Sequence, residues 1–207
     1  MLYLILRSLT FILCKILFRL QVFGRENIPL KGSFILASNH TSYLDPPLLG
    51  AACPRVLSFL AKEELFKIAF LGRLISDLNV YPVNSQSGDF GSLRRAIREL
   101  KAGKPFTIFP EGRRTADGRL QEPMRGVGLL AAKAEVPIIP AFIEGSNRAL
   151  PVHSKFIRPK KIKVYFGRAL RPQGISVQLK GRDLYQAIAV RIMEEIGRLR
   201  EKGNGEN

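Results

Sequence analysis

The sequence predicts a single α/β domain, a sandwich in which helices flank a mostly parallel β-sheet. The chain has 207 residues, 46% of them hydrophobic, which suits one domain with a buried core. From residue 23 onward short apolar runs alternate with longer amphipathic segments, as strands alternate with crossover helices. The first 22 residues are instead mostly Leu, Ile and Phe. We therefore expect an N-terminal helix (1–22), the main domain (23–202) and a flexible tail (203–207).

The N-terminal stretch predicts an amphipathic helix that lies on a membrane. Arg7, Lys15 and Arg19 interrupt it, so no uncharged run is long enough to cross about 30 Å of hydrocarbon. At about 100° per residue these cations fall within about 120° of one another, and the opposite side carries Leu2, Leu6, Leu9, Leu13, Ile16 and Leu20. Such a helix binds the surface of an anionic leaflet, and we expect a monotopic association with the cytoplasmic face of the cell membrane. A cleaved signal peptide and a helix packed on the protein's own core are the alternatives.

Six strands and five helices are expected in the rest of the chain. The strands are short apolar runs at 33–38, 56–61, 78–83, 106–109, 136–143 and 162–166. The helices are expected at 46–52, 63–74, 90–102, 126–134 and 183–200. The helix at 90–102 has the clearest pattern, because Leu93, Ile97 and Leu100 share one face and Gly103 with Pro105 ends it.

The charge and the cysteines limit the kinds of partner and site. A net charge of +16 implies an anionic partner, such as an anionic membrane, a phosphorylated substrate, an acidic carrier or nucleic acid. Nucleic acid fits least, because Trp is absent, most phenylalanines lie within apolar runs and no nucleic-acid-binding module is visible. Cys14 and Cys53 have no metal-ligand spacing, so we expect no metal site, no disulfide framework and a reducing cytosolic setting.

The residues Asn39–Asp45 follow the first of these strands and contain a candidate catalytic pair. His40 precedes Asp45 by five positions, and Pro46 favours a helix start directly after Asp45. Five positions on a regular helix rotate two side chains by about 140°, whereas a strand-to-helix turn can fold them together. His40 would then donate its Nδ1 proton to Asp45 and keep Nε2 to accept a hydroxyl proton. The alternative is that Asp45 only caps the helix and its spacing from His40 is accidental.

A second motif follows the strand at 106–109. It presents the carboxylate of Glu111 and the guanidinium groups of Arg113 and Arg114 on one turn. Guanidinium groups suit phosphate, because each offers a planar fork of donors. In a parallel sheet ligands collect at the carboxyl ends of the strands, where His40 is also expected. An ordinary basic loop is the alternative.

The two motifs, in this order and about 70 residues apart, resemble those of the glycerolipid acyltransferases, most closely the bacterial 1-acyl-sn-glycerol-3-phosphate acyltransferases. Asn39–Asp45 matches the NHxSxxD block of that family, and Phe109–Gly112 matches its FPEG block. Ala61–Leu65, Arg125-Gly126 and the VPxxP stretch Val136–Pro140 support the likeness, which extends over residues 22–170.

The resemblance implies a membrane enzyme of phospholipid biosynthesis. It would move an acyl group from acyl-ACP or acyl-CoA to the sn-2 hydroxyl of lysophosphatidate, giving phosphatidic acid, with no cofactor besides the thioester co-substrate. His40 would be the general base and Asp45 its orienting partner. Backbone N–H groups at the helix start near Pro46 are one candidate for stabilising the oxyanion. The substrate-binding residues would be Lys62, Glu111, Gly112, Arg113, Arg114 and Arg125.

Two positions depart from the family pattern. Ser85 stands where the family often has an arginine, and Arg113 stands where FPEG is usually followed by threonine. One alternative is therefore an acyltransferase of the same family with another lysolipid acceptor. A second alternative is a non-catalytic basic protein that binds membrane or nucleic acid. A basic cluster comprises Lys155, Arg158, Lys160, Lys161 and Lys163. It could contact anionic lipid, a CoA phosphate or an acidic carrier, or it could be a solvated strand edge.

Overall fold

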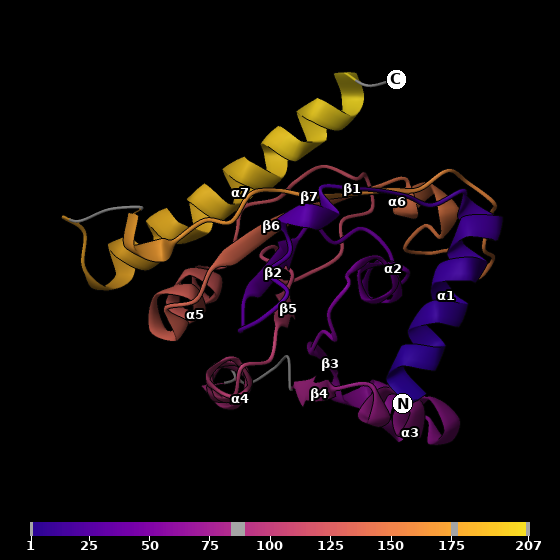
Figure 1. The fold of residues 1–207 in the computed structure, drawn as a ribbon, viewed down its shortest axis with the longest axis horizontal. Coiled ribbons are helices and arrows are strands. Elements are labelled where there is room, and N and C mark those ends of the chain that lie inside the picture. Colours follow the sequence, from indigo (N-terminus) through magenta and orange to yellow (C-terminus); the bar gives the residue numbers. More distant parts are fainter. Residues whose placement is uncertain (1, 84–89, 175–177, 206–207) are drawn as a thin grey trace.

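A computed structural model describes residues 2–83, 90–174 and 178–205 (Figure 1). In these residues the main sheet has the strand order β1-β7-β6-β2-β5. The strands are β1 (Gln21–Phe23), β7 (Lys163–Phe166), β6 (Ile138–Glu144), β2 (Ile35–Ser38) and β5 (Phe106–Ile108). The central strand β2 pairs in parallel with β5 and β6, β1 pairs in parallel with β7, and only β6 and β7 are antiparallel. The expectation of an α/β fold with a mostly parallel sheet is confirmed.

Two further strands continue the sheet beyond β5. β3 (Phe59–Lys62) and β4 (Val80–Val83) form a parallel pair. Just before β3, the amide of Ser58 donates to the Pro105 carbonyl at 3.0 Å, and the amide of Thr107 donates to the Ser58 carbonyl at 2.8 Å. Because this bridge is also parallel, β2, β3, β5 and β6 all end on the same side of the molecule. We call this side the carboxyl end of the sheet.

Helices cover both faces of the sheet, which is why β2 is apolar on both sides. Phe34 and Leu36 pack towards α1 (Leu2–Phe18) and α2 (Asp45–Ala52). Ile35 and Ala37 pack towards the second helical layer. That layer consists of α4 (Phe90–Lys101), α5 (Arg125–Ala134) and α7 (Gly181–Gly205). Every residue of β2 is buried, which fixes the position of the turn that follows it.

Shorter elements complete the fold. They are α3 (Ala69–Asp77), α6 (Ser146–Ala149) and the 3-10 turns Arg25–Asn27, Glu63–Lys67 and Pro172–Gly174. The helix expected at 63–74 is therefore divided into a 3-10 turn and α3. A Cβ on Gly72, inside α3, would lie only 2.1 Å from the Phe66 carbonyl oxygen in the 3-10 turn, so the two pieces approach more closely than a larger residue would allow.

The C-terminal helix is longer than the expected 183–200. Residues 203–205, which we expected in the flexible tail, belong to α7. Gly203 is buried, and a Cβ there would lie 3.0 Å from the ring of Tyr165. The lack of a side chain at Gly203 therefore lets the end of α7 pass close to the Tyr165 ring on β7.

The N-terminal helix packs on the protein's own core along one side. Cys14 and Phe18 are buried, the hydroxyl of Tyr3 accepts the Leu57 amide at 3.1 Å, and Arg7 Nη1 donates to the Pro54 carbonyl at 2.9 Å. Arg7 thus faces the protein. The prediction that Arg7, Lys15 and Arg19 form one basic stripe on the outer side of the helix is therefore wrong for Arg7. The opposite side exposes aliphatic residues, namely Leu4, Ile5, Leu9, Ile12, Leu13, Ile16 and Leu17. None of the helices in the described residues has the length and apolar content needed to cross a membrane.

Candidate active site

His40 and Asp45 meet in the turn between β2 and α2. Asp45 Oδ2 accepts hydrogen bonds from His40 Nδ1 at 2.9 Å and from the amides of Thr41 at 2.7 Å and Ser42 at 2.8 Å. The Asp45 side chain is fully buried, whereas that of His40 is 18% exposed. A carboxylate that accepts from the ring places the proton on Nδ1 and leaves Nε2 as the acceptor. The turn therefore holds the imidazole in the tautomer required of a general base.

The turn is fixed to the sheet by the residue before His40. Asn39 is buried, its Nδ2 donates to the Ile143 carbonyl at 3.0 Å, and its Oδ1 accepts the Ile143 amide at 2.8 Å. Through these two bonds the Asn39 side chain pairs with the backbone of β6 directly after the end of β2. The position of His40 is therefore set by the sheet rather than by a free loop.

The helix α2 has a different cap residue from the one expected, and its first turn offers no free amide to a ligand. Leu44 is the cap residue, and Asp45 is the first helical residue, with its carboxylate turned back to the preceding residues. Pro46 and Pro47 follow and have no N–H group. The amide of Asp45 donates to the Ser42 carbonyl at 3.3 Å. The idea that amides at this helix start stabilise an oxyanion is therefore wrong, because the prolines have none and the Asp45 amide is already used.

The second motif lies directly against the first. Glu111 Oε1 accepts the His40 amide at 3.0 Å, and the amide of Thr115 donates to the His40 carbonyl at 2.9 Å. The ring of His40 stacks on that of Phe109, with centroids 3.9 Å apart and planes 17° from parallel. The structure thus brings the two motifs together at the carboxyl end of the sheet.

Glu111 positions the backbone on both sides of the site. Its second oxygen, Oε2, accepts the Gln121 amide at 3.0 Å. Burial raises the pKa of this carboxyl above its ordinary value of 4.5, and the amides of His40 and Gln121 act in the opposite direction. Both oxygens accept from the backbone, so in this structure the side chain joins the two motifs and does not extend towards a ligand.

Arg114 is the cation that lies next to the His40 turn. Its guanidinium carbon is 3.4 Å from the ring centroid of Tyr43. Its Nη1 is buried and has no hydrogen-bond partner among the described residues. A buried donor without a partner is rare in folded proteins and suits an anionic ligand.

The other expected substrate-binding residues occupy the same end of the sheet. Gly112 has φ +67°, a left-handed backbone conformation that favours glycine in this turn. Lys62 ends β3, Arg113 follows the glycine and Arg125 begins α5, all with exposed side chains. Ser85, where an arginine was expected from the family pattern, lies outside the described residues.

Sequence reasoning gave no role to Asn39, Tyr43 or Phe109, although all three belong to the quoted motifs. Their contacts with Ile143, Arg114 and the His40 ring join parts of the chain that are far apart in sequence. A buried amide and two aromatic residues beside a candidate catalytic pair are a weak signal, because the sequence does not say which partner each one contacts.

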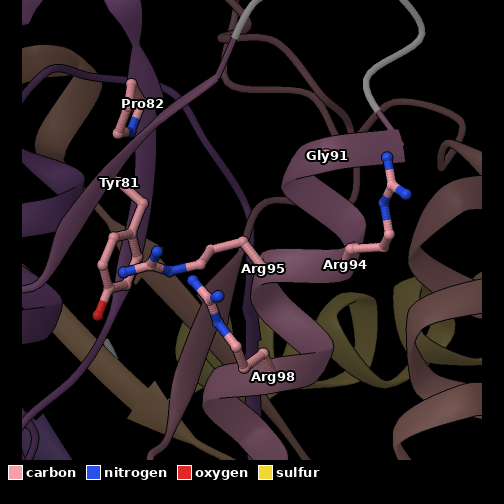
Figure 2. Close-up of a pocket in the computed structure, with 6 residues that line it drawn as sticks. All are labelled: Tyr81, Pro82, Gly91, Arg94, Arg95 and Arg98. Atoms are coloured by element: carbon pink, nitrogen blue, oxygen red, sulfur yellow. The ribbon is translucent and has the colours of Figure 1, made fainter.

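A separate concave region lies between β4 and α4 (Figure 2). It encloses about 410 Å³ and is lined by Tyr81, Pro82, Gly91, Arg94, Arg95 and Arg98. Figure 2 shows Arg95 and Arg98 reaching from α4 towards Tyr81. The Arg95 guanidinium carbon lies 3.9 Å from the Tyr81 ring centroid, and its Nε is 3.0 Å from Glu99 Oε1. Arg95 therefore holds α4 against β4, and the region contains neither of the two motifs.

Known proteins resemble this chain over most of its length. Residues 19–144 match the family model described as Acyltransferase. A Bacillus subtilis 1-acyl-sn-glycerol-3-phosphate acyltransferase is 27% identical over 184 residues, 88% of each chain. A Pseudomonas aeruginosa lyso-ornithine lipid O-acyltransferase is 30% identical over 145 residues, 69% of this chain and 55% of that protein.

A solved structure shows the same fold. The crystal structure of the 1-acyl-sn-glycerophosphate acyltransferase PlsC from Thermotoga maritima superposes with a TM-score of 0.74 at 30% identity, over 87% of this chain and 72% of that one. The family match spans more than half of the 207 residues and includes both motifs. This chain therefore belongs to the acyltransferase family.

Proposed function

We propose that this protein transfers a fatty acyl group from an acyl thioester, carried by acyl carrier protein or CoA, to the sn-2 hydroxyl of lysophosphatidate, giving phosphatidate. The observation that carries the proposal is the 2.9 Å contact between His40 Nδ1 and Asp45 Oδ2, in a turn that also contacts Arg114 through Tyr43. A base and a cation so placed can receive the hydroxyl and the phosphate of one acceptor.

The reaction needs one base and no enzyme nucleophile. His40 Nε2 takes the proton of the acceptor hydroxyl while its oxygen attacks the thioester carbonyl. The tetrahedral intermediate then expels the thiolate, which receives the proton back from the imidazolium. Acid–base help of this kind is worth about 10²–10⁴ in rate. Asp45 holds the tautomer and stabilises the transient imidazolium, and the Phe109 ring supports the imidazole plane.

The acceptor phosphate would bind to the cations at the carboxyl end of the sheet. Arg114 supports this role best, because its buried Nη1 has no partner among the described residues. Lys62, Arg113 and Arg125 would contribute from the surrounding elements, since their side chains are exposed at the same end. Arg113 would supply the positive charge that the family pattern places at the position of Ser85.

The exposed side of α1 would place the enzyme on an anionic membrane, at the cytoplasmic face and without crossing it. Its aliphatic residues are exposed, as are Lys15 in the last turn of the helix and Arg19 just after it. A helix with this distribution lies in the interface with its cations near the headgroups. The acceptor and the product are lipids and reside in the membrane, so an enzyme bound to that surface has direct access to its substrate.

The first test replaces the base. Purified His40→Ala should lose acyl transfer from a thioester to lysophosphatidate by about 10²–10⁴-fold or more, with an unchanged circular dichroism spectrum. His153→Ala is the matched control, because His153 is exposed in a loop, and it should retain full activity. Normal transfer by the His40 variant would end the proposal.

The second test asks which acceptor the cation recognises. Arg114→Gln should raise KM for lysophosphatidate and leave KM for the thioester nearly unchanged, because only the acceptor phosphate meets this guanidinium. Arg119→Gln, an exposed arginine on the same loop, is the control. The acceptors tested should include lyso-ornithine lipid, since one relative is named for it. A selective rise in the thioester KM would mean that the phosphate site is elsewhere.

A further inference from the structure

The loop between α6 and β7 exposes apolar residues inside a basic cluster. Phe156 is 80% exposed and Ile157 is 55% exposed. The cations on either side are also exposed, namely Lys155, Arg158, Lys160 and Lys161. Two adjacent large apolar side chains exposed among cations suit a partner that is both apolar and anionic.

The loop has a defined conformation. The amide of Ser154 donates to the Pro151 carbonyl at 2.9 Å. The Ser154 hydroxyl donates to the Phe156 carbonyl and accepts the Phe156 amide, both at 3.1 Å. The amide of Arg158 donates to the Ala149 carbonyl at 2.8 Å. Phe156 therefore points outward from a turn that is closed by hydrogen bonds on both sides.

The loop also touches the two other elements that the proposed function needs. At its start, the Ser42 hydroxyl donates to the Leu150 carbonyl at 2.8 Å, which joins it to the His40 turn. At its end, the amide of Ile162 donates to the Phe18 carbonyl at 3.0 Å, which joins it to the last turn of α1. The loop that carries the apolar tip is thus anchored at one end to the His40 turn and at the other end to α1.

We propose that residues 155–161 form a second membrane contact, which inserts Phe156 and Ile157 into an anionic bilayer next to the active site. A bilayer is favoured over an acidic protein because the loop exposes two large apolar side chains as well as its cations, and because its end is bonded to α1, which also exposes aliphatic residues. The cations would meet the lipid headgroups while the two apolar side chains enter the acyl region. The proposal rests on the proposed function only for the expectation that α1 also meets that bilayer.

The sequence offers a direct probe, because it contains no Trp. Phe156→Trp introduces a single tryptophan at the tip. Its emission should shift to shorter wavelength with vesicles that contain phosphatidylglycerol, and brominated lipid in those vesicles should quench it. Leu30→Trp is the matched control, since Leu30 is 77% exposed and precedes β2 at the opposite end of the sheet. Its emission should not change.

A charge variant tests the role of the cations. Lys155→Gln, Lys160→Gln and Lys161→Gln together should weaken vesicle binding several-fold. The control loses the same charge elsewhere, at exposed Lys31, Lys133 and Lys202, and should bind more tightly than the loop variant. All substitutions lie on exposed side chains, and circular dichroism should confirm that each variant is folded.

Two results would overturn the inference. One is an unshifted tryptophan emission from the Phe156→Trp variant when that protein sediments with the vesicles, because the tip would then stay in water. The other is a shift produced by acyl carrier protein without lipid, which would assign the loop to an acidic protein partner. None of these measurements uses acyl transfer, so their failure leaves the His40 test unaffected, and failure of the His40 test leaves the vesicle result standing.

Discussion

The carboxylate of Asp45 both builds the turn and orients the ring of His40, the proposed base. One oxygen, Oδ2, accepts the His40 ring and the amides of Thr41 and Ser42, all within 2.9 Å. Hydrogen bonds to an ionised acceptor are about twice as strong as neutral ones, so this atom is a strong constraint on the backbone around His40. The same atom fixes the tautomer of the ring. A single residue therefore links the local fold to the chemistry.

Asp45→Asn should separate these two roles. An amide presents an N–H group to some of these donors, so we expect about 1–3 kcal/mol lower free energy of unfolding. By analogy with the aspartate of a serine protease triad, kcat should fall by about 10³–10⁴. Urea denaturation and steady-state rates measure the two effects. The control Asp117→Asn removes an exposed carboxylate and should change neither quantity. An unchanged kcat would leave Asp45 with the structural role alone.

At the scale of elements, a small charge network attaches α4 to the end of the sheet. Glu99 is 5% exposed, and its two oxygens contact Arg95 Nε at 3.0 Å and Lys104 Nζ at 2.8 Å. Burial opposes ionisation of Glu99, but the bonds from Lys104 and Tyr81 outweigh it, and the pKa of this carboxyl is lower than its ordinary 4.5. The bond to Glu99 likewise raises the pKa of Lys104 above 10.5. The network fixes one wall of the arginine-lined region in Figure 2.

The stability that Glu99 contributes should depend on pH. Because its pKa is lower in the folded state, the contribution is complete above the ordinary value of 4.5 and is lost as the pH falls through the folded-state value. Glu99→Gln should therefore reduce the free energy of unfolding by about 1–3 kcal/mol at neutral pH, and the difference from the native chain should shrink in acid. Chemical denaturation between neutral and acidic pH measures this.

The control for that prediction is Glu194→Gln. Glu194 is exposed and pairs with Arg191 at 3.2 Å on the surface of α7. Such surface pairs contribute about 0–1 kcal/mol, so this variant should lie close to the native chain at every pH. Equal losses in the two variants would mean that Glu99 acts as an ordinary surface charge.

At the scale of the whole molecule, local patterns were predictable and distant pairings were not. The strands around Ile35 and Ile138 and the helix at Leu93 follow from apolar periodicity, and the contact of His40 with Asp45 follows from their spacing across a turn. β1 was missed because Gln21–Phe23 continues an apolar stretch, and only its pairing with β7, about 140 residues away, makes it a strand. The inward direction of Arg7 depends in the same way on a distant acceptor, the carbonyl of Pro54.

The two cysteines report whether α1 stays on the core when the protein meets a membrane. Cys14 lies on the inner side of α1 and is 5% exposed, and Cys53 is fully buried. Burial raises the pKa of both thiols, that of Cys53 to about 11. The thiolate is the reactive form, so both cysteines should react slowly with iodoacetamide in the folded protein.

In a Cys53→Ala variant, Cys14 is the single reporter, and its protection should persist on anionic vesicles. The reason is that α1 has a separate side for lipid, where Leu9 is 58% exposed, so membrane binding need not break the contacts of Cys14 and Phe18 with the core. The matched probe is Leu9→Cys with both native cysteines replaced by alanine. It should be labelled rapidly in solution and slowly on vesicles. Rapid labelling of Cys14 on vesicles would instead mean that α1 leaves the core at the membrane. The helix would then contact either the core or the bilayer, and not both at once.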